Sequence, residues 1–106
     1  MAVVSILHRL SGVLWIIALP FVLYAFELSL RNEQGYQQVI AWVHQPLATA
    51  TLILWLWFLL HHFFAGIRFL LLDMDVALSR AGARRAAWLV HLASLLSLGI
   101  IIGLLK

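Results

Sequence analysis

Long stretches without charged residues alternate with short polar segments along this chain of 106 residues. The first stretch covers residues 10–26, the second lies within residues 34–67, and the third covers residues 86–105. A helix needs about 20 mostly apolar residues to cross ~30 Å of hydrocarbon. The pattern therefore predicts an all-α integral membrane protein with three transmembrane helices. We expect one domain over residues 1–106, with spans at about 5–30, 47–72 and 86–105.

Two prolines and two polar segments refine these boundaries. Pro20 lies within the first stretch, where it removes one backbone hydrogen bond and is expected to bend the helix. Pro46 is expected to mark the start of the second span. The polar segments 31–38 and 73–85 are predicted to be loops, and residues 39–45 an approach along the membrane interface.

Composition supports a membrane protein and excludes several function classes. Hydrophobic residues make up 65% of the chain, well above the usual share in soluble domains. The chain contains no cysteine, which excludes disulfides, iron–sulfur ligation and thiol catalysis by this chain and leaves histidine as the plausible ligand of a metal or cofactor. The net charge of +3 indicates membrane orientation, because a few arginines flanking membrane spans form no patch for nucleic acid.

The arginines predict the orientation of the chain in the bilayer. Five basic residues lie on the side shared by the N-terminus and the second loop, and two lie on the other side; they are Arg9, Arg68, Arg80, Arg84 and Arg85, against Arg31 and Lys106. The positive-inside rule therefore predicts a cytoplasmic N-terminus, or a matrix one in an organelle. The polar residues expected at that face are Ser5, His8, Arg9, Arg68, Asp73 and Asp75.

Two adjacent histidines lie inside the second predicted span. His62 lies roughly 16 Å along the helix axis from Asp73, and an ionisable residue at such depth is a candidate functional residue. His61 points about 100° away, towards the stripe of Trp57 and Arg68. One helix face is expected to form a groove that admits a bulky group, and it carries Trp55, Phe58, His62, Gly66, Phe69 and Asp73. The alternative is that each histidine only packs and bonds a nearby carbonyl.

The start of the first span carries a second polar face. Ser5, His8, Arg9 and Gly12 fall within about 100° of one another on a helix. A hydroxyl, an imidazole and a guanidinium at the head-group level can bind an anionic or carbonyl-bearing ligand. The alternatives are that Arg9 only snorkels as an orientation determinant and that Gly12 only permits close helix packing.

Two segments carry a resemblance to a known family. They are residues 5–13, SILHRLSGV, and residues 62–73, HFFAGIRFLLLD. Together they resemble the cytochrome b subunit, the larger membrane anchor, of succinate dehydrogenase, which is the membrane part of succinate:quinone oxidoreductase (complex II). The resemblance covers nearly the whole chain. It implies a subunit without independent activity, which anchors a flavoprotein subunit and an iron–sulfur subunit and forms part of a haem-binding bundle in the electron transport chain and the tricarboxylic acid cycle.

The resemblance also implies roles for individual residues. His62, and not His61, corresponds to the family's axial ligand of haem b and is therefore the expected metal ligand. Ser5 and Arg9 correspond to residues that bind the quinone head group, with ubiquinone as substrate. The residues expected on the propionate side of the haem are His8, Arg9 and Arg68. The family often has a further histidine where this chain has Phe69, so Arg68 or a partner residue would replace its contact.

There are two candidate sources for the second haem ligand. The family takes it from a second, smaller anchor subunit, which we expect here, whereas the depth of His91 makes it the alternative within this chain. We expect the bacterial inner membrane, rather than the mitochondrial inner membrane, as the location. Two other functions remain: a fumarate reductase anchor that uses menaquinone, and a haem-free structural or transport subunit.

Overall fold

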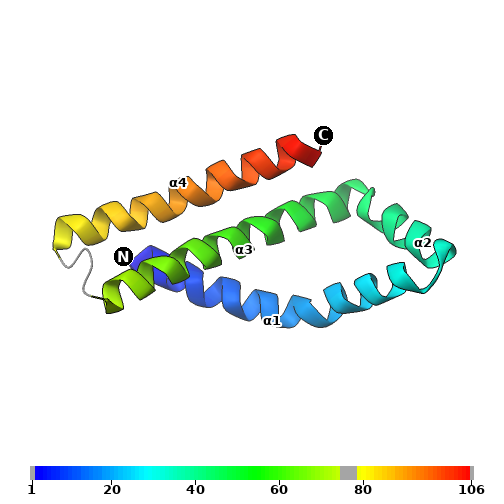
Figure 1. The fold of residues 1–106 in the computed structure, drawn as a ribbon, viewed down its shortest axis with the longest axis horizontal. Helices are drawn as coiled ribbons and strands as arrows, with labels where there is room; N and C mark the ends of the chain where they lie inside the picture. The colour runs from blue at the N-terminus through cyan, green and yellow to red at the C-terminus, as the bar shows by residue number, and fades with distance from the viewer. Residues whose placement is uncertain (1, 75–78, 106) are drawn as a thin grey trace.

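The computed structural model describes residues 2–74 and 79–105, which form four α-helices. These are α1 (Ala2–Arg31), α2 (Glu33–Val43), α3 (Pro46–Asp73) and α4 (Arg80–Leu105). The three long helices lie side by side and alternate in direction, and α2 joins α1 to α3 at one end (Figure 1). Each long helix is long and apolar enough to cross a membrane. The described residues contain no strand, and the predicted all-α fold with three spans is confirmed.

The second span begins where its proline predicts. Pro46 occupies the first turn of α3, and Gln45 precedes it in an extended conformation. Proline suits this position because its missing N–H would have no partner in the helix. Pro20, by contrast, lies inside α1, which continues on both sides of it. In a membrane helix the carbonyl freed by such a proline can be satisfied by neighbouring groups.

The prediction of a loop over residues 31–38 was wrong, because most of this segment belongs to α2. The Asn32 side chain accepts a hydrogen bond from the Gly35 backbone N–H at 2.7 Å and caps the helix. A Cβ atom at Gly35 would overlap the carbonyl oxygen of Leu28. Capping and the close approach of this glycine thus allow a polar sequence to fold as a short helix against the end of α1.

The loop predicted over residues 73–85 was wrong in its second half, because α4 begins at Arg80. The Ser79 hydroxyl accepts a hydrogen bond from the Gly82 N–H at 2.9 Å, as an N-cap residue does. α3 extends to Asp73. Asp75, which the sequence places at the same membrane face, lies outside the described residues.

The interior of the bundle is made of small and polar side chains. α3 lies between α1 and α4 (Figure 1), and the buried residues are Val4, Ser11, His61, Ala65, Arg68, Ala87, Val90 and Ser94. Most large apolar side chains point outwards and are exposed. Membrane helices pack in this way because lipid covers their apolar surface and small residues let the backbones approach.

The N-terminus, the end of α3 and the start of α4 lie at one end of the bundle, and α2 lies at the other (Figure 1). The start of the motif at residues 5–13 and the end of the motif at residues 62–73 therefore lie at the same end of the bundle. Which side of a membrane this end faces remains a prediction from the arginine count.

Candidate functional site

The two sequence motifs meet at a pair of histidines between α1 and α3. The rings of His8 and His62 stack with centroids 4.2 Å apart and 7° between their planes. Phe69 packs edge-on against His8, with ring centroids 5.1 Å apart. The residues that the sequence analysis placed on two separate helices therefore form one contact.

Hydrogen bonds to α1 determine which nitrogen of His62 carries its proton. The Nδ1 atom lies 3.1 Å from the carbonyl oxygen of His8 and 3.0 Å from the Ser11 hydroxyl oxygen. A carbonyl oxygen only accepts, so Nδ1 of His62 must be the donor. In a neutral imidazole the other nitrogen, Nε2, then keeps its lone pair.

Ser11 is a residue of this site to which the sequence analysis assigned no role. Its side chain is completely buried, and its hydroxyl donates to the carbonyl oxygen of His8 at 2.9 Å. The hydroxyl oxygen is therefore available to accept from His62. Ser11 lies within the first motif, three residues after His8, which was the available signal. The sequence could not identify its partner, because His62 lies 51 residues away.

Gly12 fits closely on α1 where the helix faces the His62 ring. A Cβ atom built at Gly12 would lie 3.2 Å from Cε1 of His62, closer than ordinary van der Waals contact. A Cβ at Gly66 would lie 3.8 Å from Nε2 of His8, which is an ordinary contact. Of these two glycines, Gly12 makes the closer approach. The sequence pattern had pointed to Gly66 for the admission of a bulky group and to Gly12 for close helix packing.

A groove of about 330 Å³ runs beside His62. Its lining consists of Gly12, Trp15, Ile16, Leu19, Leu59 and His62. The imidazole is thus the polar group of an otherwise apolar wall. At 100° per residue, Ser5 and Arg9 share the α1 stripe of Gly12 and Ile16; Ser5 is half-buried and Arg9 is exposed. This stripe connects the polar end of α1 to the groove.

His61 faces the opposite side of α3, towards α4. Its ring is completely buried, with ring centroids 5.2 Å from both Trp57 and His91. The predicted 100° separation of His61 from His62 therefore corresponds to contacts with two different helices. His91 contacts His61 and Trp88, and it lines a different pocket from His62, together with Ala2, Val3 and Val4 of α1.

The structure does not bring Arg68 to the groove. Arg68 is 6% exposed, and its Nη2 lies 3.5 Å from the carbonyl oxygen of Ala83 on α4. Its guanidinium carbon also lies 5.5 Å from the ring centre of Phe69. Of the predicted site residues, His8 and His62 are in contact, Ser5 and Arg9 share the stripe that leads to them, and Arg68 faces α4.

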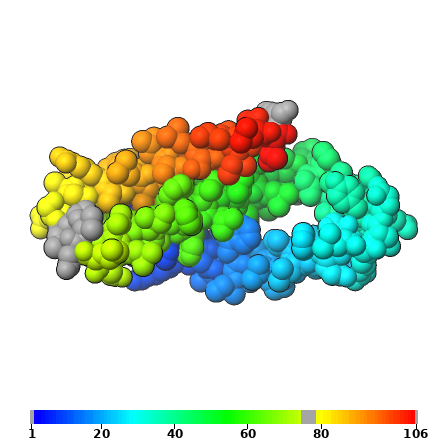
Figure 2. All heavy atoms as spheres, viewed as in Figure 1, coloured from blue at the N-terminus to red at the C-terminus, as the bar shows by residue number. Residues whose placement is uncertain are grey.

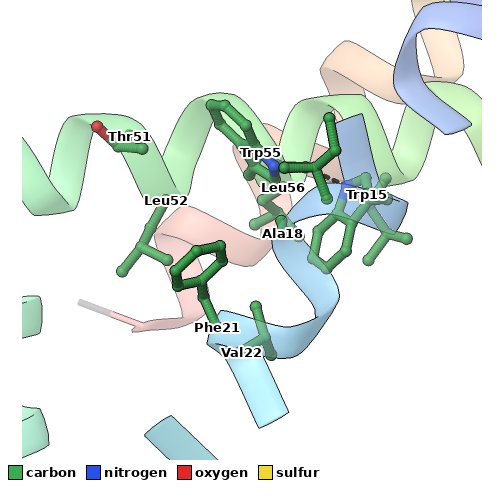
Figure 3. A pocket seen from close by; sticks show the side chains of 10 residues that line it. Trp15, Ala18, Phe21, Val22, Thr51, Leu52, Trp55 and Leu56 are labelled. Atoms are coloured by element: carbon green, nitrogen blue, oxygen red, sulfur yellow. Dashed lines mark hydrogen bonds between the residues drawn. The ribbon is translucent and has the colours of Figure 1, made fainter. Parts of the chain in front are cut away.

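A separate pocket of about 530 Å³ lies between α1 and α3, nearer to α2 (Figure 3). Trp15 and Trp55 meet at its edge, where the Trp15 indole N–H donates to the carbonyl oxygen of Trp55 at 3.0 Å. Figure 2 shows an opening in the surface between α1 and α3 beside α2. The lining of this pocket contains no titratable side chain, so it offers space for an apolar group and no chemistry.

The donor set decides which kind of cofactor could bind beside His62. In residues 2–74 and 79–105, no group of three His, Cys, Asp or Glu side chains could hold a metal ion. His62 provides one imidazole whose Nδ1 is held by Ser11 and His8, next to an apolar groove. One oriented imidazole and an apolar wall fit a flat metal-bearing macrocycle with a second ligand from elsewhere.

A comparison with protein families assigns the chain to one family. The model of the family described as "Succinate dehydrogenase/Fumarate reductase transmembrane subunit" matches residues 1–101. The match includes both motifs, the groove and all of the candidate residues described above.

Proposed function

Because the chain belongs to the succinate dehydrogenase/fumarate reductase transmembrane subunit family, we propose that it is the cytochrome b anchor of a succinate dehydrogenase. In this role it binds haem b through His62 and contributes to the site of ubiquinone reduction. The chain has no independent activity in this proposal, because succinate is oxidised on the flavoprotein subunit. Electrons then reach the quinone through the iron–sulfur subunit.

The single observation that carries the haem proposal is the hydrogen bonding of His62. Its Nδ1–H is held by the His8 carbonyl oxygen and the Ser11 hydroxyl, which leaves Nε2 to coordinate iron. Histidine ligands of metals commonly have their second nitrogen oriented in this way. Bound haem supplies a centre that accepts and donates one electron. The residues of this chain hold the imidazole ring of His62, and Gly12 leaves room for that ring.

The contacts of His91 support the proposal that the second haem ligand comes from a smaller anchor subunit. His91 lies against His61 on the α4 side of α3, whereas His62 faces α1. The two histidines also line different pockets, His62 the groove beside Gly12 and His91 a pocket with Ala2, Val3 and Val4 of α1. In this proposal a histidine of the partner anchor, on the open side of the groove, supplies the second ligand.

Ser5 and Arg9 are proposed to bind the quinone head group. A hydroxyl and a guanidinium can donate hydrogen bonds to a quinone oxygen as negative charge develops on it during reduction. His8 and Arg9 are proposed to pair with the haem propionates at the polar end of the groove. Arg68 could join them only if its guanidinium turned away from the Ala83 carbonyl oxygen.

The location and the remaining partners follow from the same proposal. We place the chain in the bacterial inner membrane with its N-terminus in the cytoplasm, because the excess of arginines lies at that end. The flavoprotein and iron–sulfur subunits then dock at this end, beside Ser5 and Arg9. Electrons would thus enter the membrane beside the proposed quinone-binding residues.

A haem-free anchor is the second candidate function, because a histidine that only packs would also donate to a carbonyl as His62 does. The decisive experiment is the reduced-minus-oxidised absorption spectrum of the purified complex with His62→Ala, and with His61→Ala as the adjacent control. We expect the first variant to lose the haem b signal and the second to keep it. Full retention of haem in His62→Ala would refute the ligand assignment.

Quinone preference separates the succinate dehydrogenase from the fumarate reductase alternative. Membranes that contain the complex should oxidise succinate faster with a ubiquinone analogue than they reduce fumarate with a menaquinol analogue. A faster fumarate reduction would assign the chain to a fumarate reductase.

A further inference from the structure

The first turns of α4 carry a groove that is cationic at its top and apolar below. This groove has a volume of about 390 Å³ and is lined by Arg84, Arg85, Trp88, Leu89 and Leu92. Both arginines are exposed. Trp88, Leu89 and Leu92 are 69%, 62% and 54% exposed. From Arg84 to Leu92 the groove follows α4 for about 12 Å, at 1.5 Å per residue.

Positive charge is concentrated at this end of the molecule. The sequence places Arg9, Arg68, Arg80, Arg84 and Arg85 here, against Asp73 and Asp75. Within the described ranges, the ion pair that is formed joins Arg31 to Glu27 and lies near the opposite end. Arginine pairs bind phosphate groups well because their planar donors match the phosphate oxygens.

The apolar part of the groove distinguishes a lipid from a soluble partner. Leu89 and Leu92 belong to α4, a helix long and apolar enough to cross a membrane, and Leu92 lies about 12 Å along its axis from Arg84, so a soluble protein docked at the arginines would leave this apolar surface in the lipid. An amphiphile covers both parts at once, because its phosphate sits beside the arginines and its acyl chain lies along the leucines. Tryptophan is also common at the head-group level of membrane proteins.

We propose that Arg84, Arg85, Trp88, Leu89 and Leu92 form a binding site for an anionic phospholipid of the leaflet at the N-terminal end of the bundle. The phosphate is held by the two arginines, and one acyl chain follows α4. Basic pockets on membrane proteins select anionic lipids by this combination of charge and apolar surface. The site does not depend on haem or quinone binding, so its failure would leave the proposed function untouched.

The test uses the whole complex, reconstituted in vesicles of phosphatidylcholine with added phosphatidylglycerol. The double variant Arg84→Gln with Arg85→Gln removes the proposed phosphate ligands, and Arg80→Gln removes charge from the same helix end outside the groove. Native mass spectrometry of the complex counts the phospholipids retained. We expect the double variant to lose one tightly bound phosphatidylglycerol per chain, with a fall in apparent affinity of about fivefold per arginine. Arg80→Gln should retain that lipid.

A second measurement does not rely on lipid surviving purification. The fluorescence of Trp88 is obtained as the difference between the tryptophan emission of the wild-type complex and that of Trp88→Phe. This fluorescence should be quenched more strongly by phosphatidylglycerol with brominated acyl chains than by brominated phosphatidylcholine. This preference should disappear in the double arginine variant. The haem spectrum and the co-purified subunits show whether each variant assembles.

Three outcomes would overturn the proposal. The first is equal loss of phosphatidylglycerol in the double variant and in Arg80→Gln, which would indicate only general surface charge. The second is retention of phosphatidylcholine as strongly as phosphatidylglycerol. The third is release of a partner subunit by the double variant while lipid binding is unchanged, which would assign the arginines to a protein interface.

Discussion

Removing the Ser11 hydroxyl should weaken haem binding without a matching loss of fold stability. In Ser11→Ala, Nδ1 of His62 loses one acceptor at 3.0 Å and keeps the His8 carbonyl oxygen at 3.1 Å. Loss of an outer hydrogen bond to a metal ligand commonly costs about 10–100-fold in metal affinity. Because one of the two acceptors remains, we expect the lower end of that range, about tenfold, which corresponds to about 1.4 kcal/mol.

The chain offers a closely matched control for this variant. Ser94 is also completely buried, and its hydroxyl donates to the carbonyl oxygen of His91 three residues before it at 2.9 Å. Ser11 makes the same local bond to His8 at the same distance. Ser94→Ala therefore removes the same groups from a buried helix interface, and the difference between the two variants isolates the bond to His62.

The assay is a haem titration of the haem-depleted complex, followed by its absorption spectrum, with thermal unfolding measured in parallel. One net hydrogen bond contributes about 0.5–1.5 kcal/mol to the free energy of unfolding, so Ser94→Ala should lose one such contribution and Ser11→Ala, which also loses the bond to His62, up to two. Only Ser11→Ala should raise the dissociation constant of haem. If both variants bind haem equally well, or if both weaken it to the same extent, the orientation of His62 by Ser11 does not contribute to haem binding.

Three further predictions concern other parts of the molecule. Gly12→Ala places a methyl group against His62 and should lower haem occupancy in the absorption spectrum severalfold, since overpacking costs about 1–3 kcal/mol. The control is Gly99→Ala, whose Cβ would meet nothing within 4 Å, and it should bind haem normally. Arg9→Gln should raise KM for the quinone in steady-state assays more than tenfold while most of the haem is retained, because His62 still holds the iron; loss of haem with an unchanged KM would place Arg9 at the propionates alone. Asn32→Ala should destabilise α2 by about 1 kcal/mol through loss of its cap, seen as faster hydrogen exchange over residues 33–43 with unchanged exchange in α4.

The membrane spans could be predicted from sequence, whereas the short helix between the first two could not. The interior of a bilayer requires every backbone polar group to be bonded within the segment, so a long apolar run has few choices other than a helix. Residues 33–43 are polar and lie under no such constraint. Their helix depends on the Asn32 cap and on the close packing of Gly35 against Leu28. The cap is a local sequence signal that is easy to overlook, whereas the packing of Gly35 is a contact that only folding creates.

The sequence named candidate residues for the site but could not give their contacts. Helical periodicity separated His61 from His62 by about 100°, and the structure places them against α4 and α1, respectively. The same periodicity could not say which neighbour each face would meet. For this reason the role of Ser11 was missed, and the direction of Arg68 towards Ala83 was not foreseen.

By itself, the sequence determined that the chain is a helical membrane protein with three spans, and its two motifs indicated the family. These features follow from the order of residues along one helix and from the solvent that surrounds it. Only the tertiary structure decided that His62 is held by α1 through Nδ1, that Gly12 lies closely against the His62 ring, and that His91 contacts His61. Such contacts join residues far apart in the chain, and their geometry depends on how the helices rotate and pack together, which no single helix specifies.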